Sequence, residues 1–403
     1  MKVLWLCNYS LKYLQHQLKI KIDNKSKHPI PWLYYLVQEI SKIKDVELHI
    51  LTLSSDLEKD YNIIEDGIHY HLIKERPFVI PTLKFGSISK RKIHSVNIFW
   101  KKKVLKIIED INPDVINIHG TEGNLQVLGN NFDIPTVVWM QGLMNFVTKY
   151  QESSKYKYWL ENENKIITHQ KHFITFPGEM EQFIKNHNPS AKFYNIYHPN
   201  PEYAFDMFNL DITKTSDIIY AAEIVKRKGI EDFIEVTKRL KSKLNIKSKI
   251  IGFTGNEEYL KYIKELIKSE ELENNIEFVG YVEEHSDVLM EIKKSKILLL
   301  PTYVDTGPRA VAESMTIGTP VISYNVDGLP EMIENNASGI LVECGNIEKL
   351  TNAVEELLTN KKKVNKIIVN AFQIALEKYS PHKVVEQLLQ LYSQILKEKS
   401  ITV

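Results

Sequence analysis

The sequence predicts an α/β protein of two doubly wound, Rossmann-like domains that face a cleft. Short apolar runs alternate with longer stretches of helical apolar spacing, and this series occurs twice. A polar stretch with prolines, about residues 200–215, separates the two series. A chain of 403 residues is also too long for a single core. Because the apolar runs are continuous, they indicate parallel strands that are buried on both faces.

The first domain is expected to span residues 1–205. Its expected strands share a short apolar run and lie at 3–7, 46–53, 115–119, 136–140 and 173–176. Helices are expected at 32–42, where leucines, valine and isoleucine recur at helical spacing, and at the stretch that ends near residue 110. A turn at Asn112-Pro113-Asp114 precedes the third strand.

The second domain is expected to span residues 206–380 and repeats the rhythm. Its expected strands lie at 217–221, 249–253, 276–279, 297–300, 321–324 and 340–342. Its expected helices lie at 229–240, 258–268, 288–294 and 308–317. A last helix, within 381–403, follows the Ser380-Pro381 break and is expected to pack toward the first domain. In such sheets, ligands bind at the carboxyl ends of the strands.

Composition and charge narrow the classes of function. With 43% hydrophobic and 26% charged residues, the chain reads as globular and not disordered. A formal net charge of +1 gives no field that would attract nucleic acid. The cysteines, Cys7 and Cys344, are too far apart in sequence for a metal motif and suggest a reducing compartment. The apolar start is too short for a signal peptide, and no run reaches a membrane span. We therefore expect a cytoplasmic protein, at most peripheral on the inner face of the membrane.

The segment from Asp305 to Glu313 carries the strongest chemical signal. It follows an apolar strand, and Pro308 suits the first position of a helix, while Gly318 suits the position just after its end. The start of such a helix presents free N–H groups and a positive dipole end, which favour an anion such as a diphosphate. The plainer alternative is that Arg309 and Glu313 form a surface ion pair worth ~0.3–0.5 kcal/mol.

This segment resembles the E-x7-E region of retaining glycosyltransferases of the GT-B fold, especially family 4. The resemblance continues through Gly318-Thr319-Pro320-Val321-Ile322 and through 327–342, and it includes Phe278-Val279-Gly280-Tyr281-Val282 upstream. It covers residues 217–392. It implies a two-domain enzyme whose second domain binds a nucleotide sugar.

The resemblance implies a role for each matching residue on the donor side. Glu313 would bind the ribose hydroxyls, and Asp305, which stands where the family has a longer Glu, would face the donor sugar. Backbone N–H groups of Thr306 and Gly307 would contact the diphosphate or the sugar. Tyr281 and Val282 would lie near the base.

A second donor element, at 221–230, resembles the family's G-R-L-x-x-x-K-G. Lys228 falls at the Lys position and would pair with the diphosphate, acting in catalysis with Asp305. Glu223 replaces the usual Arg and would repel a diphosphate, so Arg227 or Arg309 is expected to supply the missing cation. The alternative for the 226–228 run is a solvated helix start.

On the acceptor side, two stretches resemble the family's strands that border the cleft. His119 ends the first and is expected to act in catalysis, although a structural role is the alternative. Gln141, followed by Gly142, ends the second and replaces a His, so a histidine base is not expected there. Asn8 and Tyr9 form the loop after the first strand, where the family has glycines.

Residues 76–108 contain no Asp or Glu and many Lys and Arg, interleaved with aromatic residues. This pattern fits contact with an anionic membrane or a lipid-linked diphosphate. A solvated helix face is the alternative, and no nucleic-acid motif accompanies the charge.

Together these observations predict a retaining glycosyltransferase that moves a sugar from a nucleotide sugar to a saccharide or lipid-linked acceptor, in bacterial surface polysaccharide or glycoconjugate biosynthesis. The resemblance implies that no metal or other cofactor is required, and the absence of a D-x-D motif between the expected strands is consistent with this. Two alternatives remain, a nucleotide-sugar epimerase of the same fold and a non-catalytic partner subunit.

Overall fold

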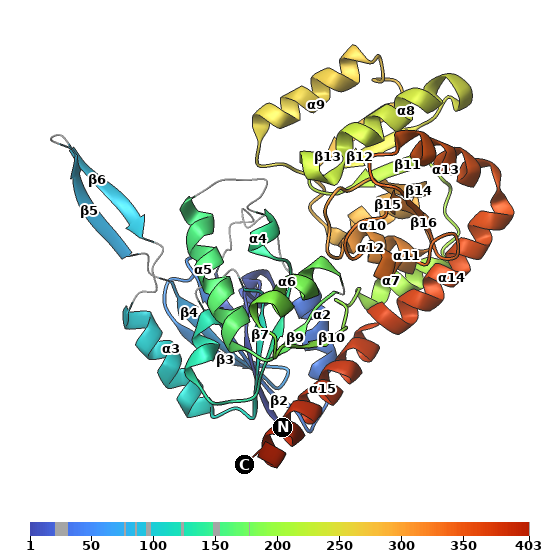
Figure 1. Ribbon diagram of the computed structural model, residues 1–403. Helices are drawn as coiled ribbons and strands as arrows, with labels where there is room; N and C mark the ends of the chain where they lie inside the picture. Colours follow the sequence, from blue (N-terminus) through green and yellow to red (C-terminus); the bar gives the residue numbers. More distant parts are fainter. Residues whose placement is uncertain are drawn as a thin grey trace. The chain divides into compact units, whose positions relative to one another are not determined.

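The chain forms two compact units in the computed structural model (Figure 1). The structure describes residues 1–20, 31–75, 78–84, 87–93, 98–121, 125–147, 154–176 and 178–402. Unit 1 comprises Met1–Thr175, Glu179–Ile196 and Val384–Val403. Unit 2 comprises Phe176–Gly178 and Tyr197–Lys383. The end of the chain therefore belongs to the unit that contains its beginning.

Unit 1 is built on an eight-stranded sheet in the order β10-β9-β8-β7-β1-β2-β4-β3. The strands are β1 Lys2–Leu6, β2 Glu47–Ser54, β3 Tyr61–Glu65, β4 Ile68–Lys74, β7 Val115–His119, β8 Thr136–Trp139, β9 His172–Ile174 and β10 Lys192–Tyr194. Every pair is parallel except β3 with β4. The predicted strands of the first series are all present in this sheet.

Helices cover both faces of the unit 1 sheet. The helical segments are η1 Leu11–Leu14, α1 Gln15–Leu18, α2 Pro31–Ile40, α3 Ile98–Ile111, η2 Gln126–Asn131, α4 Met144–Val147, α5 Ser154–His169, α6 Glu179–His187 and α15 Pro381–Thr402. Successive β1 residues enter different apolar clusters: Trp5 packs with residues of α2 and α15, and Leu4 with residues of α3 and α5. This alternation explains why β1 is apolar at every position from Val3 to Leu6.

Two hairpins in unit 1 were not predicted. The β3–β4 hairpin turns at Asp66 and Gly67, both of which have positive φ (49° and 77°). Asp-Gly is a preferred pair for such a turn, so this signal was available in the sequence. The second, β5 Phe78–Lys84 with β6 Ser87–Ile93, forms a separate two-stranded sheet within the basic stretch. Residues 76–77, 85–86 and 94–97 of that stretch lie outside the described residues.

Unit 2 is built on a six-stranded, wholly parallel sheet in the order β13-β12-β11-β14-β15-β16. Its strands are β11 Ser216–Ala221, β12 Ser248–Ile251, β13 Ile276–Gly280, β14 Ser295–Leu300, β15 Val321–Tyr324 and β16 Ile340–Val342. Its helical segments are α7 Glu202–Asp206, η3 Met207–Asn209, η4 Lys226–Lys228, α8 Ile230–Leu244, α9 Glu257–Ser269, α10 His285–Lys293, α11 Arg309–Ile317, α12 Leu329–Met332, α13 Ile347–Thr359 and α14 Lys361–Tyr379. One apolar cluster joins sheet and helices.

The predicted fold class is confirmed, since both units are α/β and dominated by parallel strands. The sheet order of unit 2 reverses direction between β11 and β14, which is the point where ligands bind in doubly wound sheets. Both donor-side elements of the sequence lie there, because one follows β11 and the other follows β14. Among the described residues, no helix is long and apolar enough to cross a membrane.

Candidate functional site

The β14–α11 connection forms the centre of the candidate site in unit 2. Pro308 is the N-cap of α11 and has an extended backbone (φ −66°, ψ 118°), so the helix begins at Arg309, one residue later than predicted. Gly318 ends the helix in the left-handed conformation (φ 76°), as predicted. The first turn of α11 contains no acidic residue. Its free N–H groups and dipole therefore favour an anion at the loop 305–307.

Glu313 is buried in α11 and is held by the side chains of His285 and Arg309. Its Oε1 atom lies 2.8 Å from His285 Nε2 and 2.7 Å from Arg309 Nη2. Burial alone would raise the pKa of this carboxyl, but the charges and hydrogen bonds of His285 and Arg309 lower it to about 2. Both contacts use Oε1, and among the described residues no hydrogen bond reaches Oε2. The ionised carboxylate therefore keeps one oxygen for a further donor.

His285 is a site residue that the sequence analysis missed. It is the first residue of α10, and its Nδ1 atom lies 3.0 Å from the hydroxyl of Tyr203. Tyr203 is the second residue of α7. The chain Tyr203–His285–Glu313 thus joins three helices of unit 2. No motif marks His285, because its partner Glu313 lies 28 residues further along the chain. Only the fold shows that the two meet.

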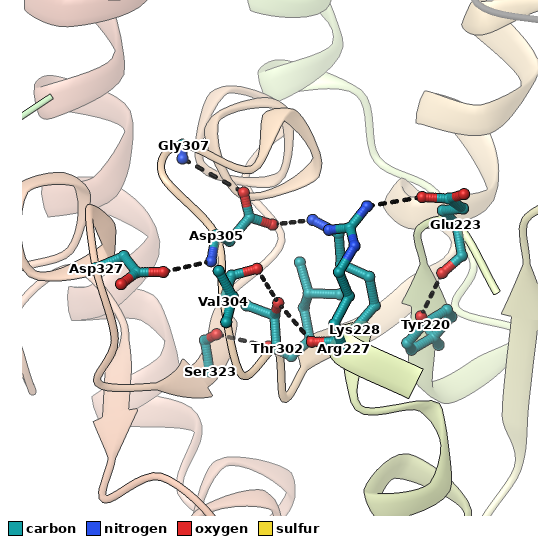
Figure 2. A network of polar contacts seen from close by, with 11 residues as sticks. Tyr220, Glu223, Arg227, Lys228, Thr302, Val304, Asp305, Gly307, Ser323 and Asp327 are labelled. Atoms are coloured by element: carbon teal, nitrogen blue, oxygen red, sulfur yellow. Dashed lines mark hydrogen bonds and ion pairs between the residues drawn. The ribbon is translucent and has the colours of Figure 1, made fainter. Parts of the chain in front are cut away.

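Asp305 and Lys228 form an ion pair that links the two donor-side elements (Figure 2). Both side chains are largely buried, at 14% exposure for Lys228 and 10% for Asp305. The backbone N–H of Asp305 donates to Asp327 Oδ2 at 2.7 Å, and that of Gly307 donates to Asp305 Oδ1 at 3.4 Å. The structure thus brings Asp305 and Lys228 together, and Asp327 is an additional residue that fixes the loop.

Glu223 and Arg227 neutralise each other at the edge of the same network. Arg227 Nη2 donates to Glu223 Oε2 at 2.8 Å, while Tyr220 donates its hydroxyl hydrogen to the Glu223 carbonyl (Figure 2). The carboxylate at the family's Arg position therefore has its own cation. Arg309 is likewise paired, with Glu313. Arg227 and Arg309, the two arginines expected to supply a cation for the diphosphate, therefore each already contact a carboxylate.

Close backbone approaches hold these loops together. Gly229 follows Lys228 with φ 71°, and a Cβ atom there would lie 1.8 Å from the Pro301 carbonyl oxygen. Gly328 lies similarly close to Thr306, because a Cβ atom added at Gly328 would lie 2.1 Å from the Thr306 carbonyl oxygen. At Gly307 the neighbour is the Phe176 ring, 2.6 Å from a Cβ atom. Side chains at these positions would push the donor loops apart.

Tyr281 and Val282 follow the edge strand β13. Tyr281 is 55% exposed and contacts the Phe253 ring edge-on, with 6.2 Å between centroids. Val282 is half-buried against the core of unit 2. An exposed aromatic ring at the carboxyl end of a strand offers a surface on which a base can stack.

The acceptor-side residues of the sequence analysis lie at strand ends of unit 1. His119 ends β7 and is only 1% exposed; its ring centroid lies 4.7 Å from Trp5, 5.4 Å from Trp32 and 5.6 Å from Trp139. His119 is therefore enclosed by indole rings, an environment that equally suits a structural histidine.

The remaining residues of that group differ in exposure. Gln141 and Gly142 are half-buried after β8. Asn8 is exposed, whereas Tyr9 is 5% exposed and donates its backbone N–H to Thr52 Oγ1 at 3.1 Å. Asn8 is thus the more accessible of the two loop residues.

Glu163 is a second residue that the sequence analysis missed. It is fully buried in α5 and accepts hydrogen bonds from the Thr121 hydroxyl (2.8 Å), the Met144 N–H (3.0 Å) and both the N–H and the side-chain amide of Asn145. These donors follow β7 and β8. Glu163 therefore anchors the loops that carry His119 and Gln141.

Comparisons with known proteins agree with this geometry. Residues 204–374 match the family model for glycosyl transferases of group 1. An uncharacterized glycosyltransferase of Methanocaldococcus jannaschii is 24% identical over 370 residues, covering 88% of this chain and 92% of that protein. The N,N'-diacetylbacillosaminyl-diphospho-undecaprenol alpha-1,3-N-acetylgalactosaminyltransferase of Campylobacter jejuni is 27% identical over 206 residues, 51% of this chain and 52% of that enzyme. The chain thus spans about half the length of this second relative.

A solved structure supports the fold over the whole length. The Anabaena protein HepE, in complex with UDP, superimposes with a TM-score of 0.71 at 14% sequence identity and covers 98% of this chain and 100% of that one. Residues 204–374 therefore carry a domain of the group 1 glycosyl transferases, and the likeness to the solved structure shows that the chain as a whole has the GT-B fold.

Proposed function

We propose that the enzyme transfers a sugar from a nucleoside diphosphate sugar, with retention of anomeric configuration, to a hydroxyl of a saccharide or lipid-linked acceptor. Surface polysaccharide or glycoconjugate biosynthesis in a bacterium is the process that this reaction would serve. The Campylobacter jejuni relative supports the lipid-linked acceptor by its name, and the Anabaena structure supports the nucleotide because it contains UDP.

The single observation that carries the proposal is the ionised, buried Glu313 with one oxygen left for a donor. A carboxylate that is held rigidly by His285 and Arg309 can accept hydrogen bonds from ribose hydroxyls through Oε2. Such a bond to a charged acceptor is worth about 1.5–3 kcal/mol. The surface ion-pair alternative for Arg309 and Glu313 does not explain why Glu313 is 4% exposed and has His285 as a second partner.

The rest of the donor site suits the departure of a diphosphate. Lys228 and the N–H groups at the start of α11 would stabilise the negative charge that develops on the leaving group. Asp305 would release Lys228 as the diphosphate arrives and would face the sugar. This scheme uses no metal ion at the diphosphate, since fixed protein charges supply the stabilisation. The acceptor would be held by Asn8, Gln141 and Gly142 of unit 1.

The proposal can be tested with UDP-, GDP- and ADP-sugars and with Glu313→Gln. We expect titration calorimetry to detect one preferred nucleoside diphosphate, and Glu313→Gln to weaken it by about 10–100-fold. Glu235→Gln is the matched control, because Glu235 forms an i,i+4 pair with Arg239 on the exposed face of α8. Unchanged affinity in Glu313→Gln would exclude the ribose role.

Product analysis tests the reaction itself. Incubation of the preferred sugar nucleotide with polyprenol-linked saccharides should release nucleoside diphosphate, and NMR of the product should show the anomeric configuration of the donor. An inverted product would contradict retention. Conversion of the sugar nucleotide to its epimer without acceptor would instead support the epimerase alternative.

A further inference from the structure

Three histidines and a glutamate gather on one face of the unit 1 sheet. In the parallel pair β2–β4, His49 lies opposite His69, and Leu51 lies opposite His71. Residues two apart in a strand point to the same face, so Glu47 and His49 of β2 share a face with His69 and His71 of β4. In the sequence these residues belong to two short strands and match no metal motif.

The potential ligand atoms lie close to one another. Glu47 Oε1 is 2.9 Å from His49 Nε2, and the ligand atoms of Glu47, His49 and His69 all lie within 4.8 Å of each other. His49 is buried, His69 is half-buried and Glu47 is exposed, so the group opens to solvent on the Glu47 side. Ligands of a tetrahedral zinc ion bond at about 2.0–2.2 Å, which small side-chain movements would allow here.

The residues behind His49 fix its orientation. His49 Nδ1 lies 3.0 Å from His71 Nε2, and His71 Nδ1 lies 3.1 Å from Asn62 Oδ1. Because the Asn62 oxygen accepts, His71 donates from Nδ1 and accepts from His49 at Nε2. His49 then carries its hydrogen on Nδ1 and presents the Nε2 lone pair to the Glu47 carboxylate. Two acceptors that face each other in this way are satisfied by a cation between them.

We propose that Glu47, His49 and His69 bind a divalent transition-metal ion of the zinc type, with water at the fourth position. Imidazole nitrogen with one carboxylate oxygen is a ligand set that zinc accepts. The hydrogen bond from His49 to His71 supplies the outer support that metal-bound histidines usually have. The other cation at Glu47 is Lys2, whose Nζ stands 3.8 Å from Oε1 and donates to the Ile111 carbonyl.

The proposed ion serves stability and not sugar transfer. Glu47 and His49 lie at the start of β2, whereas His119 ends its strand and Asn8 and Gln141 follow the carboxyl ends of theirs. In a parallel sheet these are opposite edges. The ion would join β2 to β4, and β3 is attached to the sheet through β4. This site is therefore independent of the proposed function, which uses no metal at the diphosphate.

The test is zinc binding by the full-length chain, measured by competition with a chromophoric chelator after the protein has been stripped of metal. We expect the wild type to bind one zinc ion and to gain thermal stability from it. His69→Gln and Glu47→Gln should each weaken binding by about 100-fold or more and remove the thermal gain, and His71→Gln should cost about 10–100-fold.

Glu47 is exposed, so Glu47→Gln should fold normally. This variant therefore still tests the proposal if a histidine variant fails to fold. His187→Gln is the control, because His187 is an exposed histidine on α6 that contacts only the Phe183 carbonyl among the hydrogen bonds found for it. Equal zinc affinity in wild type, His69→Gln and Glu47→Gln, or no binding by the wild type, would overturn the proposal and leave a purely hydrogen-bonded cluster. Sugar transfer should persist in the stripped protein, so either result leaves the proposed function separately testable.

Discussion

Lys228 and Asp305 illustrate how one pair of residues can prepare a site for an anion. The ammonium and the carboxylate neutralise each other at low exposure. A diphosphate would compete with Asp305 for Lys228, so nucleotide binding must separate the pair or share the ammonium. The shorter Asp, where the family has Glu, still reaches Lys228, because the loop is held by Asp327.

This arrangement predicts opposite effects for the two partners. Lys228→Gln should weaken binding of the nucleoside diphosphate by about 10–100-fold, because it removes a charge-assisted contact. Asp305→Asn should bind the diphosphate as well as or better than the wild type, because Lys228 is released, while turnover falls about 100-fold or more. Calorimetry and steady-state kinetics separate the two quantities.

The Lys249–Glu291 pair provides a matched control within unit 2. Lys249 Nζ lies 2.5 Å from Glu291 Oε2, and the side chains are 8% and 21% exposed. Glu291→Gln should therefore alter stability without changing nucleotide affinity. If Lys228→Gln and Asp305→Asn weakened binding of the nucleoside diphosphate equally, the role of the Lys228–Asp305 pair would be structural.

At the scale of the element, the turn from η4 into α8 positions Lys228. Val225 is the extended N-cap of η4, and Gly229 is both the C-cap of η4 and the N-cap of α8. Its left-handed backbone lets the chain turn directly against Pro301, which follows β14. The glycine therefore determines how closely the two donor-side elements approach each other.

Gly229→Ala should be strongly destabilising. Gly67→Ala is the control, since Gly67 has a similar φ (77°) but no atom within 4 Å of an added Cβ. Gly67→Ala should cost about 1–2 kcal/mol from the left-handed backbone alone. Gly229→Ala should cost at least about 2 kcal/mol more in urea unfolding, because its Cβ meets the Pro301 oxygen. Equal losses in the two variants would show that the turn adapts.

At the scale of the whole molecule, two histidines with lowered pKa values, one in each unit, link folding to pH. In unit 2, burial and the nearby Arg309 lower the pKa of His198 from 6.5 to about 3. In unit 1, burial lowers the pKa of His172 to about 4, although Glu398 opposes the shift. Between these values and 6.5, the unfolded chain binds protons that the folded chain does not. The contribution of the two neutral histidines to the free energy of unfolding is therefore complete above about pH 6.5 and is lost as the pH falls below that value.

We therefore expect the free energy of unfolding to decrease from pH 7.5 to pH 5, and to decrease less in His198→Gln and His172→Gln. Urea unfolding at both pH values measures this difference, and each histidine should account for about 1.4 kcal/mol per pH unit at most. The exposed His187, substituted by Gln, is the control and should leave the pH dependence as in the wild type. If the free energy of unfolding decreased as much in His198→Gln and His172→Gln as in the wild type, the lowered pKa values of these histidines would be contradicted.

Much of this molecule follows from local patterns in the chain. Strands β1, β2, β7, β8 and β9 of unit 1 and the strands of the unit 2 sheet are short apolar runs, and α11 is delimited by Pro308 and Gly318, so the sequence sufficed to predict them. Strand β10, which is only three residues long and begins with an exposed Lys192, was not predicted. The β3–β4 hairpin was missed because its strands alternate in burial, although Asp66-Gly67 marked the turn. Resemblance to a family, and not spacing, brought Lys228 and Asp305 together in the prediction.

The sequence by itself determined the α/β class, the two series of strands and helices, and the place of Glu313 on the helix after β14. Only the tertiary structure decided which distant side chains meet Glu313, Asp305 and His49. His285, Glu163 and His69 take part because strands and helices from separate segments pack together, and a contact between residues far apart in the chain leaves no periodic signal.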